Sequence, residues 1–482
     1  MTPLGPWVPD QPRIMPAQLS EAKNVTPQLQ SYGPFKDLSN GTAALASRPF
    51  GATSFRDAQG TTHVFAAEAD ALSELAADGT WTDLTRLSGV YNCATTTTWR
   101  FTQFGDLCLA TNFDDEVQTF TMSSGANFTD LAGTPPRAKH ITTFSDFVVL
   151  GYTDTSTSEV RWCAINDPES WTKGTSQADA QILPDGGIVQ GFSAGEVLYI
   201  FQQSRIRRMQ YVGPPIIMDI QPITNGLGCI APGSIADFGG GAAFLSNDGF
   251  YVLSGDQLQP IGANFVDQWF NADVNTEYLY RMSSAADTKS KLIYWSYAST
   301  AAVTGTPDTI LVYNWSSQRW SYARVTNEGI LRAYSLGYTL DGLDTLTTNI
   351  DNFDIPLDDP SLTGGNLTIN GWSSAYQLGP FSGSALEATL ITGDFEVHPK
   401  KRTYISGVEP FIDTTSVTVA VAPRERLGGT VTYLDAQPLE VNGQASADAS
   451  GRFHRFKMIV EAGATWTDAT GIDLEAQLDG ET

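Results

Sequence analysis

Hydrophobic and polar positions alternate in short segments through most of this chain, and the segments are separated by Gly- and Asp-rich turns. Between residues 49 and 375 they form a loose repeat with a period of roughly 40 to 50 residues, and a tryptophan often stands near the end of a unit. The pattern predicts strands grouped in successive units, at 51–81, 99–131, 144–171, 197–211, 241–253 and 291–320, with a weaker seventh at 330–375.

Several short strands per unit, repeated at this period, are typical of a β-propeller. A single twisted sheet cannot bury both of its faces, whereas radial stacking gives each sheet two neighbours and leaves only short edges. A pair of β-sandwiches is the rival architecture, but it usually lacks tryptophans at the ends of the units. We therefore predict an all-β protein with a β-propeller of six or seven blades over residues 49–375.

The two flanks of the repeat differ from it. Residues 1–48 are predicted to form an extended arm, because prolines at 3, 6, 9, 12, 16, 27 and 34 prevent long helices. Such arms lie along a partner subunit or a neighbouring domain. Residues 376–482 are predicted to form a small separate antiparallel β domain, with strands at 386–391, 395–397, 403–408, 416–422 and 453–461.

One segment between the fifth and sixth units has helical spacing. Apolar residues stand at 265, 266, 269 and 270, which predicts a short helix over 264–270 that packs on the repeat, and 276–280 could add a second turn.

Composition strengthens the β assignment and narrows the function. Charged residues make up 17% of the chain, while Gly (44) and aromatic residues (11%) are abundant, which suits strands and turns better than helices. The formal net charge is −25, which argues against a protein that grips duplex DNA, since phosphate contacts need clustered cations. It is compatible with DNA that slides past an acidic wall.

Targeting and redox signals are weak. Apolar runs fall short of the roughly 18 residues that a membrane helix needs, and residues 1–35 lack a signal-peptide pattern, so we expect a soluble protein made in a cytoplasm, without membrane insertion. The four cysteines have no short spacing and are predicted to be buried free thiols: Cys93, Cys108, Cys163 and Cys229.

Catalytic candidates are poor. The acidic runs 114–116 and 358–359 have turn-like settings, where solvated side chains are expected, and neither fits a calcium loop. Segments 246–250 and 78–81 resemble the sialidase Asp-box only in part, and Asp-Gly hairpin turns explain them. The histidines at 63, 140, 398 and 454 are far apart, and no nucleophile motif occurs. We predict no enzyme, no cofactor and no metal.

Basic clusters are the sharpest anomaly in so acidic a chain. Strand alternation would place Arg205 and Arg207 on one face and Ile206 with Arg208 on the other. Two functions remain open, a duplex-binding strip or a salt-bridged contact with acidic surface on a neighbouring subunit. The candidates for subunit contact or for lining a channel are Arg205, Arg207, Arg208, Lys400, Lys401 and Arg402.

The fifth and sixth units carry a resemblance, with support from the third unit and the arm. Segments 244–253, 266–270, 304–308 and 312–320, together with 160–162, 167–171, 24–25 and 32–35, resemble the packaged-DNA stabilisation or tail nozzle proteins of short-tailed (podovirus-type) bacteriophages. The resemblance spans most of the chain. It implies a β-propeller in a structural virion protein of the tail, assembled as a homohexamer that extends the DNA exit channel and helps to retain the packaged genome. Implied partners are the tail adaptor or head-to-tail connector protein, a tail fibre or spike, and genomic DNA passing through the lumen.

Two alternatives belong to other classes. A receptor- or glycan-binding propeller at the tail tip would expose aromatic side chains around a loop pocket. A propeller glycosidase would need convergent carboxylates, which the sequence pattern lacks.

Overall fold

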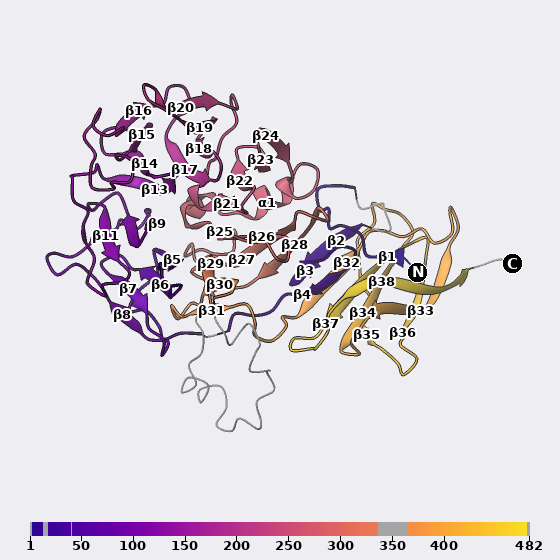
Figure 1. Ribbon diagram of the computed structural model, residues 1–482. Coiled ribbons are helices and arrows are strands. Elements are labelled where there is room, and N and C mark those ends of the chain that lie inside the picture. The colour runs from indigo at the N-terminus through magenta and orange to yellow at the C-terminus, as the bar shows by residue number, and fades with distance from the viewer. Residues whose placement is uncertain (1, 13–17, 40, 336–364, 480–482) are drawn as a thin grey trace.

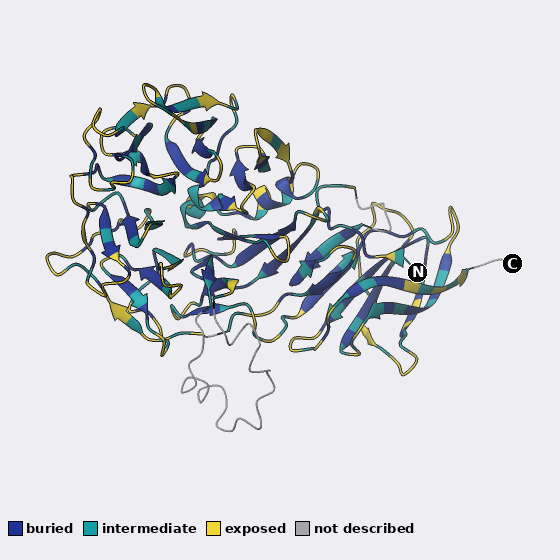
Figure 2. Ribbon diagram, viewed as in Figure 1, coloured by how far each residue is buried: buried dark blue, intermediate teal, exposed yellow. Residues whose placement is uncertain are grey.

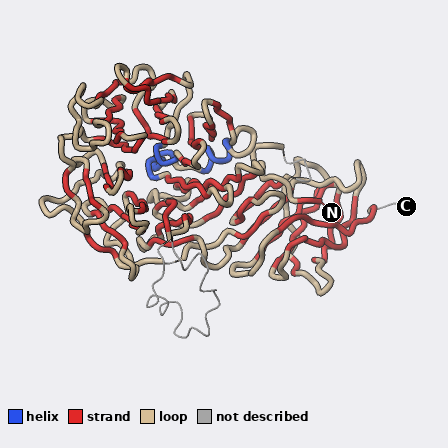
Figure 3. Tube along the Cα trace, in the orientation of Figure 1, coloured by secondary structure: helices blue, strands red, loops and turns tan. Residues whose placement is uncertain are grey.

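The computed structural model describes residues 2–12, 18–39, 41–335 and 365–479. These residues are almost entirely strand and loop, as Figure 3 shows, and the prediction of an all-β chain is confirmed. The predicted acidic run at 358–359 and most of the weak seventh unit lie outside the described residues. No helix in the described ranges has both the length and the apolar character of a membrane span.

Five four-stranded antiparallel sheets follow one another along the chain. The first two contain β5 (Gly51–Arg56), β6 (Thr62–Ala67), β7 (Leu72–Leu75) and β8 (Trp81–Asp83), then β9 (Arg100–Phe104), β10 (Leu107–Thr111), β11 (Gln118–Thr121) and β12 (Thr129–Asp130). The third and fourth contain β13 (Ala138–Phe144), β14 (Phe147–Thr153), β15 (Glu159–Trp162) and β16 (Asp179–Ile182), then β17 (Val189–Ala194), β18 (Leu198–Gln202), β19 (Ile206–Gly213) and β20 (Ile217–Pro222). The fifth contains β21 (Ala236–Asp237), β22 (Gly241–Ser246), β23 (Gly249–Ser254) and β24 (Gln257–Pro260).

Two further groups of strands complete this part of the molecule. The sixth group contains β25 (Ser283–Asp287), β26 (Leu292–Tyr297), β27 (Thr309–Asn314) and β28 (Arg319–Arg324). The seventh is a three-stranded sheet of β29 (Gly329–Tyr334), β30 (Leu367–Trp372) and β31 (Leu378–Pro380). The predicted helix is present as α1 (Asp267–Asp273), and the short 3-10 helices are η1 (Pro232–Ser234) and η2 (Thr276–Arg281).

The seven groups are arranged around a common centre, as Figure 1 shows. Their first strands, called the inner strands here, are β5, β9, β13, β17, β21, β25 and β29. Inner strands of successive groups contact one another, and β29 contacts β5, so the series returns to its start. The link from β17 to β21 is made by side chains, including a 2.8 Å hydrogen bond from Ser193 Oγ to Asp237 Oδ2. Backbones approach so closely that a Cβ on Gly233 would lie 1.7 Å from the carbonyl oxygen of Met282.

The two ends of the chain fold together beside these groups. The N-terminal segment supplies β1 (Thr2–Pro3), β2 (Leu19–Lys23), β3 (Val25–Pro27) and β4 (Tyr32–Pro34). The C-terminal segment supplies β32 (Ala388–Thr392), β33 (Thr403–Ile412), β34 (Val417–Arg424), β35 (Gln437–Pro438), β36 (Ala445–Gly451), β37 (Phe453–Val460) and β38 (Ala469–Leu478). One sheet has the order β3-β4-β38-β33-β36, with β1 also on β38.

Strand β2 joins the two parts. It pairs in parallel with β28 through Lys23 and Tyr322, and antiparallel with β32 on its other edge. A nine-stranded sheet results, in the order β25-β26-β27-β28-β2-β32-β37-β34-β35. The largest hydrophobic cluster follows this sheet, from Trp295 and Trp320 to Val421 and Phe456, and Figure 2 shows the buried strands where the parts meet.

Some predicted boundaries differ from these pairings. Strand β31 lies beyond residue 375 but pairs with β30, because Asn370 to Trp372 hydrogen-bond to Leu378 to Pro380. The strand predicted at 395–397 is wrong: only Phe395 makes a bridge, to His454, and the chain then turns at 397–400. The four cysteines are buried and free, as predicted.

Candidate functional site

The arginine cluster at the start of β19 makes contacts within its own chain. Arg207 is 5% exposed, and its Nε donates a 2.8 Å hydrogen bond to Gln202 Oε1. On the other face, Ile206 is buried and Arg208 forms a 2.7 Å ion pair with Asp256 of the fifth sheet. The alternation is therefore as predicted. Arg205 lies just before the strand, with its Nη1 4.0 Å from Asp185.

The second basic cluster precedes β33 at the far end of the molecule from β19 (Figure 1). All three side chains are exposed. Arg402 pairs with Glu425 at 2.9 Å and with Asp479 at 3.5 Å, while the backbone N–H of Lys400 donates to Glu396 Oε1 at 2.8 Å. The structure does not bring Lys400, Lys401 and Arg402 together with the β19 arginines.

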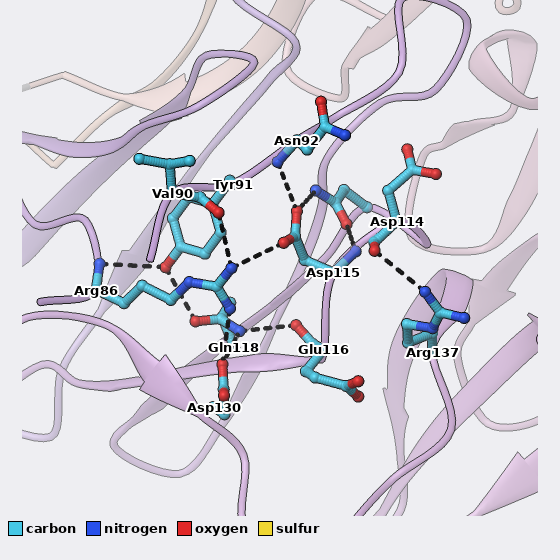
Figure 4. Close-up of polar contacts among 11 residues, drawn as sticks. Arg86, Val90, Tyr91, Asn92, Asp114, Asp115, Glu116, Gln118, Asp130 and Arg137 are labelled. Atoms are coloured by element: carbon cyan, nitrogen blue, oxygen red, sulfur yellow. Dashed lines mark hydrogen bonds and ion pairs between the residues drawn. The ribbon is translucent and has the colours of Figure 1, made fainter. Parts of the chain in front are cut away.

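The acidic run at 114–116 holds two loops in place, as Figure 4 shows. Asp115 accepts hydrogen bonds from the Asn92 backbone N–H and from Asn112 Nδ2, both at 2.9 Å. It also forms a 2.9 Å ion pair with Arg86, and its side chain is only 10% exposed. Asp114 Oδ2 accepts from the Ala94 N–H at 2.9 Å. The expectation of solvated side chains was wrong for Asp114 and Asp115, because backbone amides and Arg86 bind these two carboxylates, while Glu116 is exposed as expected.

A cavity of about 340 Å³ lies between the inner strands of the first, second, sixth and seventh groups, at the end where these strands begin. We call it the central cavity. It is lined by the starts of β5, β9, β25 and β29, the segments just before them, and the segment before β21. Its charged lining residues are Arg48, Arg100, Arg281, Arg332 and Glu328. Four cations therefore face one carboxylate in a protein whose formal net charge is −25.

Most of these arginines have partners. Arg281 forms an ion pair with Glu328, and both side chains are nearly buried. Arg48 donates a 3.2 Å hydrogen bond to the Thr95 carbonyl and lies over the Phe50 ring, 4.0 Å from its centroid. Arg332 donates to Thr288 Oγ1 at 3.2 Å.

Arg100 differs from the other three. Its side chain has no hydrogen bond or ion pair within the described residues, and its Nε is fully buried without a partner. Arg100 is one of the residues that line the central cavity, and it is intermediate in burial. Burial lowers the pKa of the Arg100 guanidinium, because the charged form loses its hydration.

Strand β13 adds two basic side chains near Arg100. Burial lowers the pKa of Lys139, and the charge of Arg100 lowers it further. His140 is 4% exposed, and burial holds its pKa well below the usual range, with further lowering by Arg100 and Lys139. Its Nε2 has no hydrogen-bond partner. Arg100 and Lys139 therefore place two positive charges near one another, with Asp114 as a counter-charge close to Lys139, while the lowered pKa keeps His140 uncharged near neutral pH.

Sequence reasoning missed this site. Its arginines are spread from residue 48 to residue 332; Arg48, Arg100 and Arg281 stand at or just before the start of an inner strand, and Arg332 lies within β29. The usable signal would have been a basic residue at the beginning of several repeat units.

Comparisons with known proteins leave the family open. The sequence matches no family model and no curated protein. Among solved structures, one match is the crystal structure of the computationally designed Ika8 protein, at 10% identity and a TM-score of 0.35, covering 72% of this chain and 98% of that chain. A likeness at this TM-score does not identify a fold or a function.

Proposed function

We propose that this chain is a structural protein of a phage tail, a nozzle or head-completion protein that extends the DNA exit channel and helps to retain the packaged genome. It acts as a homohexamer between the tail adaptor or connector and a tail fibre or spike. The proposal begins from the resemblance of the segments quoted above to packaged-DNA stabilisation and tail nozzle proteins.

The observation that carries the proposal is the continuous sheet from β25 to β35. Domains joined by a linker move relative to each other unless their interface is large and hydrophobic. Here β2 continues the hydrogen-bonded ladder between the two parts, and one hydrophobic cluster extends through both. A body without a hinge at this junction suits the wall of a conduit that must keep its shape while DNA passes.

The fold within this proposal is a seven-bladed β-propeller. Contacts between successive inner strands, including β29 with β5, support it. A further support is the segment before the first sheet, which lies beside β31. The Ser39 N–H donates to the Pro380 carbonyl at 3.0 Å, and the Gly41 N–H donates to the Leu378 carbonyl at 3.1 Å. An N-terminal segment thus adds the outer edge of the seventh sheet, which ties the ends of the repeat together.

Native mass spectrometry of the full chain, alone and mixed with the tail adaptor protein, tests the proposal. We expect a species of six copies in at least one of the two samples, and imaging of the intact particle should locate the chain at the exit channel. A chain that stays monomeric in both samples contradicts the proposal. Binding on a glycan array by such a monomer would favour the receptor-binding alternative.

The exposed lysines before β33 allow a sharper version of this test. The double variant Lys400→Glu with Lys401→Glu reverses both charges. It should weaken assembly at least about tenfold, because the new carboxylates would repel the acidic surface expected on the neighbouring subunit. Lys289→Glu, on an exposed turn between β25 and β26, is the matched control and should leave assembly unchanged. If the wild type, the double variant and the control assemble equally well, these lysines do not form part of the subunit contact.

A further inference from the structure

We propose that the central cavity is a binding site for a small phosphate-bearing anion, with Arg100 as the residue that binds it directly. The inference goes beyond the proposed function and does not depend on it. It rests on the charge that lines the cavity and on the missing partner of one guanidinium.

The charges of the lining do not balance. Glu328 is the only carboxylate among the lining residues, and its partner is Arg281. Arg48 and Arg332 hydrogen-bond to uncharged oxygens, so their charges are not neutralised by those contacts. Lys139, on the inner strand beside β9, lies outside the lining but close to Arg100, and the Asp114 carboxylate offsets part of its charge.

Arg100 is the position in the lining where a positive charge lacks any partner within the described residues. A guanidinium has five N–H donors, and burying a charged group without a partner is unfavourable. Each of the other lining arginines has a hydrogen bond within the chain, and Arg100 has none among the described residues. An anion in the cavity would supply both the missing acceptors and the missing charge.

The chemistry of the site points to phosphate. Guanidinium groups match phosphate geometry through two parallel hydrogen bonds. A doubly charged anion also neutralises several nearby cations better than a single carboxylate does. The cavity volume of about 340 Å³ falls near the lower end of the roughly 300–1,000 Å³ of small-molecule sites. It therefore suits free phosphate or a small phosphate monoester.

Thermal unfolding of the full chain in chloride buffer, with inorganic phosphate added, tests the proposal. The melting temperature of the wild-type protein should rise with phosphate concentration, because a ligand that binds only the folded state stabilises it. Sodium chloride at the same ionic strength should not reproduce the rise. Adenosine monophosphate in a parallel titration distinguishes a phosphate ester from the free ion, and a tighter response to either one supports the site.

Two variants separate binding from folding. Arg100→Gln should lose the phosphate response and should be at least as stable as the wild type without phosphate, since it removes an unpaired buried charge. Arg208→Gln removes an ion-paired arginine outside the cavity and should keep the response. If Arg100→Gln fails to fold, Arg100→Lys serves instead, with binding weakened about tenfold by loss of the two-bond geometry.

The proposal is overturned if wild-type protein shows no response beyond that to sodium chloride. It is equally overturned if the Arg100 variant that folds responds to phosphate as the wild type does.

Discussion

Asp394 lies between two buried arginines in the C-terminal part of the molecule. Its Oδ2 accepts a 3.0 Å hydrogen bond from Arg455 Nη2, and its Oδ1 accepts bonds from Arg455 Nε and Arg424 Nη2. The three side chains are no more than 6% exposed. One carboxylate therefore compensates two guanidinium groups that have little access to water.

Replacing this carboxylate should be costly. Asp394→Asn is expected to lower the free energy of unfolding by about 3–5 kcal/mol, because it leaves two buried charges without a counter-charge. Urea denaturation measures the change. Glu425→Gln breaks the exposed ion pair with Arg402 and serves as the control, with an expected loss below about 1 kcal/mol. Similar losses in the two variants would contradict the argument.

Asp267 is a second buried carboxyl, with a different consequence. Burial raises its pKa to about 6; the hydrogen bond from the Phe250 N–H opposes this, and the nearby carboxylates of Asp10 and Asp248 add to it. A raised pKa means that the folded state binds the proton more tightly than the unfolded state. The stability that this proton contributes is present below the ordinary pKa and is lost as pH rises through about 6.

This sign gives a pH prediction. As the pH rises from 4 to 7, ionisation of Asp267 should lower the free energy of unfolding of the wild type by on the order of 1–3 kcal/mol. Asp267→Asn should lack this component and be more stable than the wild type at pH 7.5. Chemical denaturation of both proteins at several pH values measures the difference. Parallel pH profiles of the two proteins would show that Asp267 is not responsible.

At the scale of elements, helix α1 depends on a residue far away in the sequence. Its own N-cap position, Val266, provides no side-chain hydrogen bond. Asp10 takes this role: its Oδ2 accepts from the Gln268 N–H at 2.8 Å, and its Oδ1 accepts from the Trp269 N–H at 2.9 Å. Its negative charge also lies at the positive end of the helix.

Loss of this cap should be measurable. Asp10→Ala is expected to lower the free energy of unfolding by about 0.5–2 kcal/mol, the usual cost of removing a capping side chain. Asp10→Asn should retain part of the stability, because the amide oxygen still accepts a hydrogen bond. Asp70→Ala, in an exposed turn, is the control and should change stability by less than about 0.5 kcal/mol. An equal effect of the two alanine variants would contradict the capping role.

At the scale of the whole molecule, charge and connectivity are distributed unevenly. The chain carries a formal net charge of −25, yet the charged residues that line its central cavity are four arginines and one glutamate. The two parts of the molecule share one sheet and one hydrophobic cluster through β2. The molecule therefore combines an acidic overall charge with a cluster of arginines at the central cavity, and its two parts are joined by backbone hydrogen bonds as well as by apolar packing.

The sequence by itself determined the elements whose signals are local. Apolar alternation and Asp-Gly turns predicted the strand-rich units, and helical spacing at 265–270 predicted α1, because burial imposes these periods on neighbouring residues. The placement of Arg207 on one face of β19, and of Ile206 and Arg208 on the other, could be predicted for the same reason. Buried free thiols also followed from cysteine spacing alone.

Only the tertiary structure decided the contacts between distant segments. The Asp10 cap, the insertion of β2 between β28 and β32, and the gathering of Arg48, Arg100 and Arg281 join residues that are about 50 to more than 350 positions apart. Hydrophobic periodicity indicates which face of a strand is buried, but it does not indicate which other strand pairs with its edge or which charged side chain packs against it. These choices follow from the closing of the seven groups and from the packing of both chain ends on one core.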